Sequence, residues 1–397
     1  MANDLTFEQV STVLNEVVQQ ATGQSELAAV DTASFVTVGQ AALKMGYDPV
    51  IKAISQVISR TLFAVRPYTA HFKGLMVDAE KWGNHVRKLT FISKPAVDSK
   101  VYSLTDGSSV DHYTINNAEV VQTNFYGGNI WQDFITRYTD QLDSAFRGPE
   151  EFSSFMAGVM TELSNKREQQ NESMARAALC NFIGGKMAGS TNDVIHLLTE
   201  YKALTGLTLT ATDVYKPENY KAFMEWVAGR IMEVCALMTE RSALFHTSLT
   251  IGDDDKVILR HTPYDRQKVY LSAGQQYQYN ARVLADVFHD NYLQYADVEM
   301  VNYWQNIADP LSISVYESYL AADGTIHVNE ASGAAPTKTD VLFGVIFDEE
   351  AVGVTTKDDT LLATPVNARG KYTNLWWSAN YRWWNDFTEN GVVLLLD

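Results

Sequence analysis

The feature that most constrains this chain is a long helical pattern with two apolar ends and a wholly polar middle. The pattern begins at Gly148-Pro149, because proline suits the first turn of a helix, and Gly184-Gly185 predicts its end. Apolar stripes occupy residues 152–163 and 174–182, but residues 165–173 between them are all polar. A helix inside a globular core is rarely polar all round for two turns. We therefore expect this helix to lie across a thin subunit with its middle in water.

A two-residue period, typical of β-strands, precedes this helix in residues 86–125. In the segment VRKLTFI at residues 86–92 two sets of side chains alternate, and β-prone residues recur further along. Turn signals interrupt the stretch at Lys94-Pro95 and Asp106-Gly107. Because the stretch is polar for its length, we expect a long extended hairpin or arm with only a small core of its own.

The rest of the chain predicts short helices at the start and a mixed α/β region in the middle. The first 65 residues carry three short helical patterns, and Pro217 begins another helix with an apolar face. Short strands then alternate with helical pieces, such as residues 281–288, up to about Ile346. A surface loop is expected at residues 330–338, which are rich in Ala, Ser, Gly and Pro. The fold class that follows is α+β.

The last fifty residues are expected to be entirely β, with a turn at Asn390-Gly391 before the final strand. Strict alternation divides their tryptophans between two faces of one strand. Trp377 and Trp383 share the apolar face, so we expect them in a packed sheet core. Trp376 and Trp384 lie on the more polar face and are better candidates for contacts with another protein, because tryptophan is favoured in interface hot spots.

Charge and cysteine content exclude several classes of protein. The formal net charge is -17 and the pI about 4.9, and no basic stripe is present, which argues against tight binding to nucleic acid. Cys180 and Cys235 lie in predicted helices beside apolar neighbours, so we expect buried reduced thiols. No stretch approaches the ~18 apolar residues of a membrane helix, and the start lacks a secretory pattern. We expect the protein to fold in a cytoplasm.

Motifs for catalysis and metal binding are weak, so the sequence predicts no enzyme, cofactor or metal ion. Gly184-Gly185-Lys186 resembles the end of a phosphate-binding loop, but it follows a helix and lacks the required upstream glycine and the Ser or Thr. Asp253-Asp254-Asp255 is favoured as a solvated turn, because it lacks the spacing of a calcium loop. The eight histidines are dispersed along the chain.

In their order, these parts resemble the Hong Kong 97-type fold of tailed-bacteriophage major capsid proteins. Residues 135–152 (ITRYTDQLDSAFRGPEEF) resemble the lead-in to the spine helix in the short-tailed, protein-primed phage group. Residues 347–354 (FDEEAVGV) resemble the strand leaving the axial domain, and residues 367–397 resemble the aromatic C-terminal β segment. The resemblance covers the chain from about Val86 onward. The first 65 residues are either an elaborated N-terminal arm or a scaffold-like segment.

The resemblance implies a structural subunit of the icosahedral phage head, found in the virion and assembled in the cytoplasm of the bacterial host. Its implied partners are copies of itself as pentamers and hexamers, portal and scaffolding proteins, and packaged double-stranded DNA without specific binding; no membrane or cofactor is implied. The implied divisions are an N-terminal helical arm (1–68), the peripheral-domain start with the extended E-loop (69–134), the peripheral domain with the spine helix (135–215), the axial domain (216–346) and a β return to the peripheral domain (347–397).

Charged residues of the expected arm, together with the two tryptophans on the polar face, are the candidates for contacts between subunits. Contacts with a neighbouring subunit would replace the core that the arm lacks. Each exposed ion pair is worth only about 0–1 kcal/mol, and an ordinary solvated hairpin explains the charges equally well. The candidates are Arg87, Lys88, Lys94, Lys100, Asp106, Asp111, Trp376 and Trp384.

A carbohydrate-binding or other β-rich interaction protein is the alternative, because abundant tyrosine and tryptophan faces could stack on sugars. Such a protein would be a compact β-sandwich with an exposed aromatic row, and the long amphipathic helix disfavours it. A hydrolase would instead need a deep pocket with a perturbed acid–base pair.

Overall fold

The computed structural model describes residues 11–12, 14–16, 18–19, 38, 72–77, 86–92, 101–109, 113, 115, 117–138, 149–189, 192–249, 258–274, 297–329 and 335–397. The chain divides into two compact units, and each combines segments that are far apart in the sequence. Unit 1 comprises Met1–Gly83, Gly128–Met174 and Thr355–Arg382, and unit 2 comprises Asn84–Gly127, Ala175–Val354 and Trp383–Asp397. Helices and strands are mixed along the chain, which confirms the predicted α+β class.

A four-stranded sheet organises unit 1, in the order β1 (Met76–Val77), β13 (Val352–Ala363), β14 (Tyr372–Asn385) and β4 (Gly128–Tyr138). β13 begins in unit 2, and β14 ends there. β14 pairs antiparallel with β4, in register from Tyr372↔Tyr138 to Arg382↔Gly128. Alternate side chains of β14 are buried, which confirms the predicted alternation as far as Tyr381. The buried apolar set is Leu375, Trp377, Ala379 and Tyr381.

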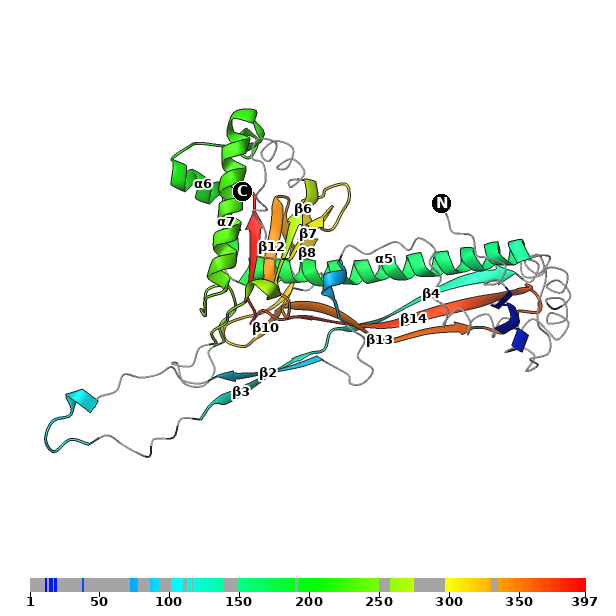
Figure 1. Ribbon diagram of the computed structural model, residues 1–397, viewed down its shortest axis with the longest axis horizontal. Coiled ribbons are helices and arrows are strands. Elements are labelled where there is room, and N and C mark those ends of the chain that lie inside the picture. The colour runs from blue at the N-terminus through cyan, green and yellow to red at the C-terminus, as the bar shows by residue number, and fades with distance from the viewer. Residues whose placement is uncertain are drawn as a thin grey trace. The chain divides into compact units, whose positions relative to one another are not determined.

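The long predicted helix is α5 (Pro149–Gly189), which in unit 1 runs beside β4 and β14 (Figure 1). Its polar middle contacts polar side chains of this sheet. Lys166 Nζ lies 3.0 Å from Asp133 Oδ2, and the Tyr381 hydroxyl donates a hydrogen bond to Asn171 Oδ1 at 2.5 Å. The expectation that the middle of the helix lies in water is therefore wrong in part, because side chains of its own chain bind one side of it.

The end of α5 corrects the prediction that Gly184-Gly185 stops the helix. The helix continues to Gly189. Because the two glycines have no side chains, other segments of unit 2 pack closely against the helix there. A Cβ atom on Gly184 would overlap Val315 Cγ2, and one on Gly185 would lie 2.5 Å from Phe387 Cζ. The two glycines are therefore packing positions inside a helix.

A five-stranded sheet forms the centre of unit 2, in the order β5 (Val194–His196), β15 (Gly391–Leu395), β12 (Leu342–Asp348), β6 (Gln267–Ser272) and β7 (Asp297–Val301). β12 runs antiparallel to β15 and β6, whereas β5 is parallel to β15 and β7 is parallel to β6. The last strand of the chain is thus an inner strand of this sheet, so residues 347–397 divide between the two units.

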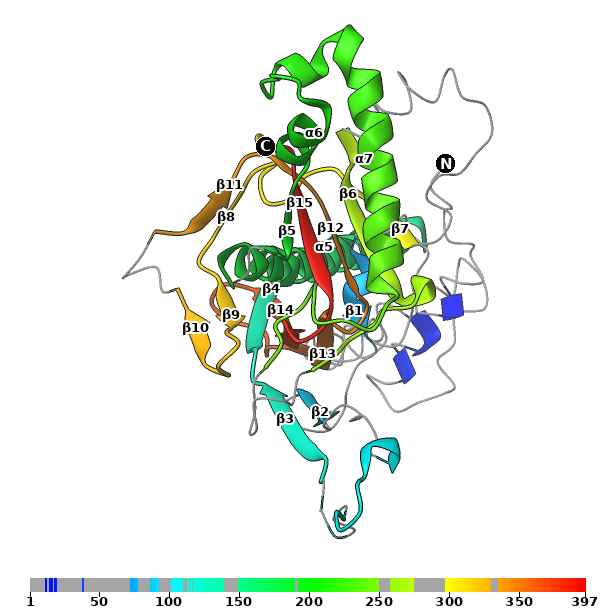
Figure 2. The same cartoon turned by 90° about the vertical axis from the view of Figure 1, so that its left-hand side faces the viewer.

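Helices lie on both sides of this sheet. α7 (Pro217–Met238) begins at the predicted proline and packs on one face with α6 (Leu197–Thr205) (Figure 2). Their shared core includes Phe223, Val227, Ile231, Val234, Val269, Leu271, Ile346 and Leu394. On the other face Phe182 of α5 lies with its ring centroid 5.9 Å from that of Phe347. This half of α5 therefore completes a helix–sheet–helix arrangement.

Short elements complete the described part of the chain. β8 (Ile313–Val315) pairs with β11 (Thr337–Thr339), and β9 (Ser318–Leu320) pairs with β10 (Ile326–Val328). The 3₁₀ helices are η1 (Lys73–Leu75), η2 (Val101–Ser103), η3 (Asp213–Tyr215) and η4 (Tyr264–Arg266). β11 overlaps the last two residues of the loop predicted at residues 330–338, so the end of that loop is a strand.

Several predicted features lie outside the described residues. They include the helical piece at residues 281–288, the triple aspartate at 253–255 and most of the N-terminal helical patterns. Leu14 and Val18 are described, and both are helical and buried, as their apolar period predicts.

Residues 86–125, which we call the arm, belong to unit 2, and their two described strands pair as the predicted hairpin requires. Its ribbon consists of β2 (Val86–Ile92) paired antiparallel with β3 (Glu119–Phe125). In the loop beyond the ribbon, Ser108 N donates a hydrogen bond to Thr105 O at 3.0 Å, and Gly107 has a φ of 83°. A positive φ at the third residue of such a turn favours glycine, so the predicted Asp106-Gly107 turn is confirmed.

Gly184→Ala tests whether the glycines of α5 are packing positions. We expect the free energy of unfolding to fall by about 1–3 kcal/mol, because the added methyl group overlaps Val315. Gly229→Ala in α7 is the matched control: no atom lies within 4 Å of its Cβ position, so helix propensity should stabilise this variant by up to about 1 kcal/mol. Urea denaturation measures both, and effects of the same sign would contradict the packing role.

Candidate functional site

The ribbon of the arm has two faces with different surroundings. Along β2 every second side chain is more covered, so Lys88 and Ile92 share an inner face toward their own chain. Leu89 and Phe91 lie on the outer face and are 49% and 71% exposed. Val120, which is opposite Phe91 in the β2–β3 register, is 55% exposed. The outer face therefore carries a strip of exposed apolar side chains.

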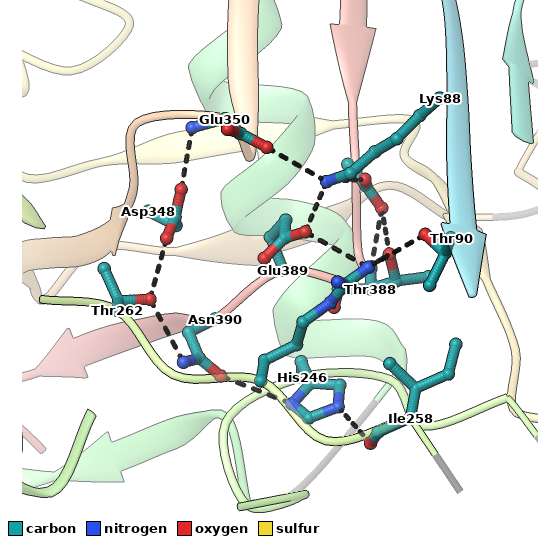
Figure 3. Close-up of polar contacts among 12 residues, drawn as sticks. Lys88, Thr90, His246, Ile258, Thr262, Asp348, Glu350, Thr388, Glu389 and Asn390 are labelled. Atoms are coloured by element: carbon teal, nitrogen blue, oxygen red, sulfur yellow. Dashed lines mark hydrogen bonds and ion pairs between the residues drawn. The ribbon is translucent and has the colours of Figure 1, made fainter. Parts of the chain in front are cut away.

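Lys88 reaches from the inner face into a cluster of carboxylates (Figure 3). Its Nζ lies 2.9 Å from Asp386 Oδ2 and 3.5 Å from Glu350 Oε2, and it donates a hydrogen bond to Glu389 Oε1. Asp386 is 1% exposed and Glu389 is 5% exposed. Burial lowers the pKa of Lys88, but the charges of Asp386 and Glu389 outweigh burial, so this pKa is raised. The site therefore stabilises the ammonium form.

Arg260 is a second cation at the same place. Its Nη2 lies 3.2 Å from Glu389 Oε1 and donates to the Thr90 hydroxyl, also at 3.2 Å. Its Nε donates to Thr388 O at 3.1 Å. Arg260 thus joins the inner face of the ribbon to the segment that carries the carboxylates.

That segment, residues 386–390, is the turn between β14 and β15. Asp386 Oδ1 accepts hydrogen bonds from Thr388 N at 2.9 Å and from the Thr388 hydroxyl at 2.6 Å, the local pattern that aspartate favours in turns. Asn390 Nδ2 donates to Thr262 Oγ1 at 3.1 Å, and the Thr262 hydroxyl donates to Asp348 Oδ2 at 2.8 Å. The turn therefore holds its own polar groups in place.

His246 lies at the far side of this network (Figure 3). Its Nε2 donates to Ile258 O at 2.9 Å, and its Nδ1 lies 3.3 Å from Asn390 Oδ1. Burial lowers the pKa of His246, and the positive charges of Lys186 and Arg260 lower it further. The imidazole is therefore held largely neutral at pH 7.

An apolar anchor fixes the end of β2. Ile92 is 3% exposed and packs with Leu249 and Ile258, while Val121 and Leu320 pack against the same cluster. Full burial of such a side chain contributes about 1.5–3 kcal/mol. The inner face is thus bound through an ionic, a hydrogen-bonded and an apolar contact at three alternate positions.

A second buried ion pair lies beneath the same turn. Lys186 Nζ lies 2.9 Å from Asp193 Oδ2, and it donates to Phe245 O at 3.1 Å and to Glu389 O at 3.5 Å. Complete burial lowers the pKa of Lys186, and Asp193 opposes this effect. The Gly184-Gly185-Lys186 string therefore belongs to the packed end of α5, and its lysine is committed to a structural pair.

The predicted contact residues of the arm lie in different surroundings. Arg87 is exposed on the outer face of the ribbon, and Asp106 is exposed in the turn of the loop. Lys88 has its carboxylate partners in its own chain, which the prediction of pairing across subunits did not foresee. A role between subunits stays a prediction for all three. The other predicted charges lie outside the described residues: Lys94, Lys100 and Asp111.

The predicted tryptophans have partners within the chain. Trp376 stacks on Phe134 with ring centroids 4.6 Å apart, and Trp384 Nε1 donates to Glu350 O at 3.1 Å. Trp377 is buried, as predicted, whereas Trp383 is only half-buried. The roles of Trp376 and Trp384 between subunits stay predictions.

Sequence reasoning did not single out Arg260, Asp386 or Glu389. The available signal was the string NDFTENG at residues 385–391, in which two acids and an Asp-x-Thr pattern precede an apolar strand. A surface turn explains that string equally well, because the sequence does not show that the turn is buried.

Cys180 and Cys235 are buried free thiols, as predicted, and burial raises their pKa values to about 12 and about 11. Among the described residues no group of three or more His, Cys, Asp or Glu side chains could hold a metal ion. No described helix is long and apolar enough to cross a membrane.

Comparison with known proteins gives a family and a fold. The model of the Phi29-like phage major capsid protein family matches residues 10–395. A chain in the structure of head fiber and inner core protein gp22 of native bacteriophage P68 superposes with a TM-score of 0.53 at 9% identity, over 85% of this chain and 87% of that chain. A chain in the capsid structure of Staphylococcus phage Andhra gives a TM-score of 0.52 at 10% identity, with the same two coverages of 85% and 87%. No curated protein matches the chain.

The neutral state of His246 predicts a pH dependence of stability. A base whose folded pKa lies below its unfolded value of about 6.5 contributes stability above that pH, and this stability is lost as the pH falls toward the folded pKa. We expect the free energy of unfolding to drop between about pH 7.5 and about pH 5.5, by at most about 1.4 kcal/mol per pH unit for one proton.

Urea denaturation across this range measures the drop. His246→Gln should reduce the slope, whereas His261→Gln, at an exposed histidine, should leave it unchanged. Equal slopes in the wild type and His246→Gln would show that His246 is not the responsible group.

Proposed function

The chain belongs to the Phi29-like phage major capsid protein family, and from this premise we propose how its parts divide the work of the shell. The protein is a major capsid protein that assembles with copies of itself into the phage head. It is a component of the virion and a structural protein, not an enzyme. The carbohydrate-binding alternative is therefore discarded.

The element order supports an assignment of subdomains. We assign unit 1 to the peripheral domain, α5 to its spine helix, the sheet of unit 2 with α6 and α7 to the axial domain, and the arm to the E-loop. The 41 residues of α5 support the spine assignment. Because β15 lies inside the sheet of unit 2, we place the final strand with the axial part, which revises the predicted boundary at residue 347.

Assembly of a phage head also calls for partners other than the subunit itself. A portal and a scaffolding protein remain the expected ones. The net charge of -17 supports a wall that encloses double-stranded DNA without gripping its phosphates. Enclosing the DNA in this way requires no specific nucleic-acid site on this chain.

The exposed apolar strip of the arm is the observation that carries the proposal for contacts between subunits. Leu89, Phe91 and Val120 on the outer face are about half exposed or more, and Tyr113 and Ile115 in the loop are 89% and 81% exposed. Covering such side chains is favourable by about 25 cal/mol per Å² of apolar surface. We propose that the outer face and loop of the arm are covered by a neighbouring copy in the shell.

Phe91→Glu tests this proposal. Because the change places a charge in the covered strip, we expect shell yield to fall at least about tenfold, the effect of losing about 1.4 kcal/mol per contact. Subunit stability should change little, because Phe91 is 71% exposed within its own chain. Phe91→Leu keeps the site apolar and should assemble nearly as well as the wild type.

Sedimentation and negative-stain electron microscopy of the full-length chain would measure shell yield for both variants. Shells formed by Phe91→Glu at the wild-type yield would rule out the outer face as a contact surface.

A further inference from the structure

The buried carboxylates of the turn at residues 386–390 take part of their compensating charge from the arm, through Lys88, while Arg260 supplies a second cation to Glu389. Asp386 Oδ2 is buried, the Lys88 ammonium lies 2.9 Å from it, and it has no further hydrogen-bond partner in the described part of the chain. Removing one partner of a buried ion pair leaves an uncompensated charge, which costs far more than the pair itself contributes. Docking of the ribbon and burial of this turn are therefore coupled.

We infer that Lys88 is a positioning residue for shell assembly: with Arg260 it holds the inner face of the ribbon on the Asp386–Asn390 turn, and only from this held position does the arm dock on a neighbouring copy. The inference rests on the proposed docking of the arm. It adds that the docking competence of the arm is set by contacts within its own chain.

The geometry of β2 supports this division. The inner face is bound at three alternate positions, by Lys88 to carboxylates, by Thr90 to Arg260 and by Ile92 to an apolar cluster. The intervening side chains Leu89 and Phe91 are left exposed by the same alternation. A ribbon fixed on one face presents the other face in a defined direction, which lowers the entropy cost of binding a neighbour.

A loosened ribbon would keep every outer-face side chain, but it would bind a neighbour at a higher entropy cost. Lys88→Met should therefore separate positioning from contact. In the unassembled full-length subunit we expect hydrogen exchange at residues 86–92 to become at least about tenfold faster, which reports local opening of the ribbon. Under conditions where the wild type forms shells, we expect at least about tenfold fewer shells.

Two matched variants accompany this test. Lys88→Arg keeps the charge and should restore protection and shell yield to within about threefold of the wild type. Arg87→Met removes the adjacent cation on the exposed outer face, so hydrogen exchange of the ribbon should stay at the wild-type rate. A purely structural ion pair would instead lower the thermal midpoint of Lys88→Met while its folded fraction assembled normally.

If Lys88→Met fails to fold, Lys88→Met combined with Asp386→Asn removes both charges of the pair and leaves the Thr388 hydrogen bonds of the turn available. We expect this double variant to fold, to exchange faster in the ribbon and to assemble poorly. Wild-type exchange, or wild-type shell yield from either loosened variant, overturns the inference.

The outcome also separates this inference from the proposed function. If Phe91→Glu blocks assembly while Lys88→Met forms shells normally, the contact surface stands and the positioning role falls. If Phe91→Glu assembles normally, the docking of the arm is itself wrong.

Discussion

A carboxylate that is removed from water needs a cation beside it, and for Asp386 unit 2 obtains that cation from the arm. Lys88 and Glu389 are 301 positions apart in the chain, yet the first lies on the inner face of the ribbon and the second in the turn before the last strand. Arg260 contacts both segments. The ribbon is therefore bound to the turn, the turn leads directly into β15, and β15 lies inside the central sheet of the unit. Through these contacts the extended, exposed arm is connected to the packed core of unit 2.

The long helix obeys a related constraint. Its polar middle is compatible with folding because polar groups of β4 and β14 in unit 1 meet it, as Asp133 meets Lys166 and Tyr381 meets Asn171. Its far end in unit 2 contains glycines because Val315 and Phe387 come too close for side chains there. A single helix of 41 residues thus changes from polar to apolar and then to close backbone packing as its surroundings change. A neighbouring copy is therefore not needed to explain its polar segment.

The features that depend on neighbouring residues in the sequence were predicted correctly. The proline at the start of α5, the proline at the start of α7, the turn at Asp106-Gly107 and the alternation of β14 all follow from short-range chemistry. The end of α5 was predicted wrongly, because a glycine pair signals a stop unless a distant segment packs against it. Residues of that segment lie more than a hundred positions later in the chain.

The candidate site was predictable only in part for the same reason. Alternation shows that Arg87 and Lys88 lie on opposite faces of a strand, but it does not show which face is inner. The burial of Asp386 and Glu389 arises from the docking of segments from three regions of the sequence, so it left no local signal. The family resemblance, by contrast, rested on the order of whole elements and on three sequence strings, and the family model matches nearly the whole chain.

Electron cryo-microscopy of shells assembled from the full-length chain tests the central claim most directly. We predict that the arm of each copy lies on a neighbour with Leu89 and Phe91 covered, while Lys88 stays within ion-pair distance of Asp386 in its own chain. An arm whose outer face is covered by its own chain, or a Lys88 paired only with a neighbour's carboxylate, would contradict this.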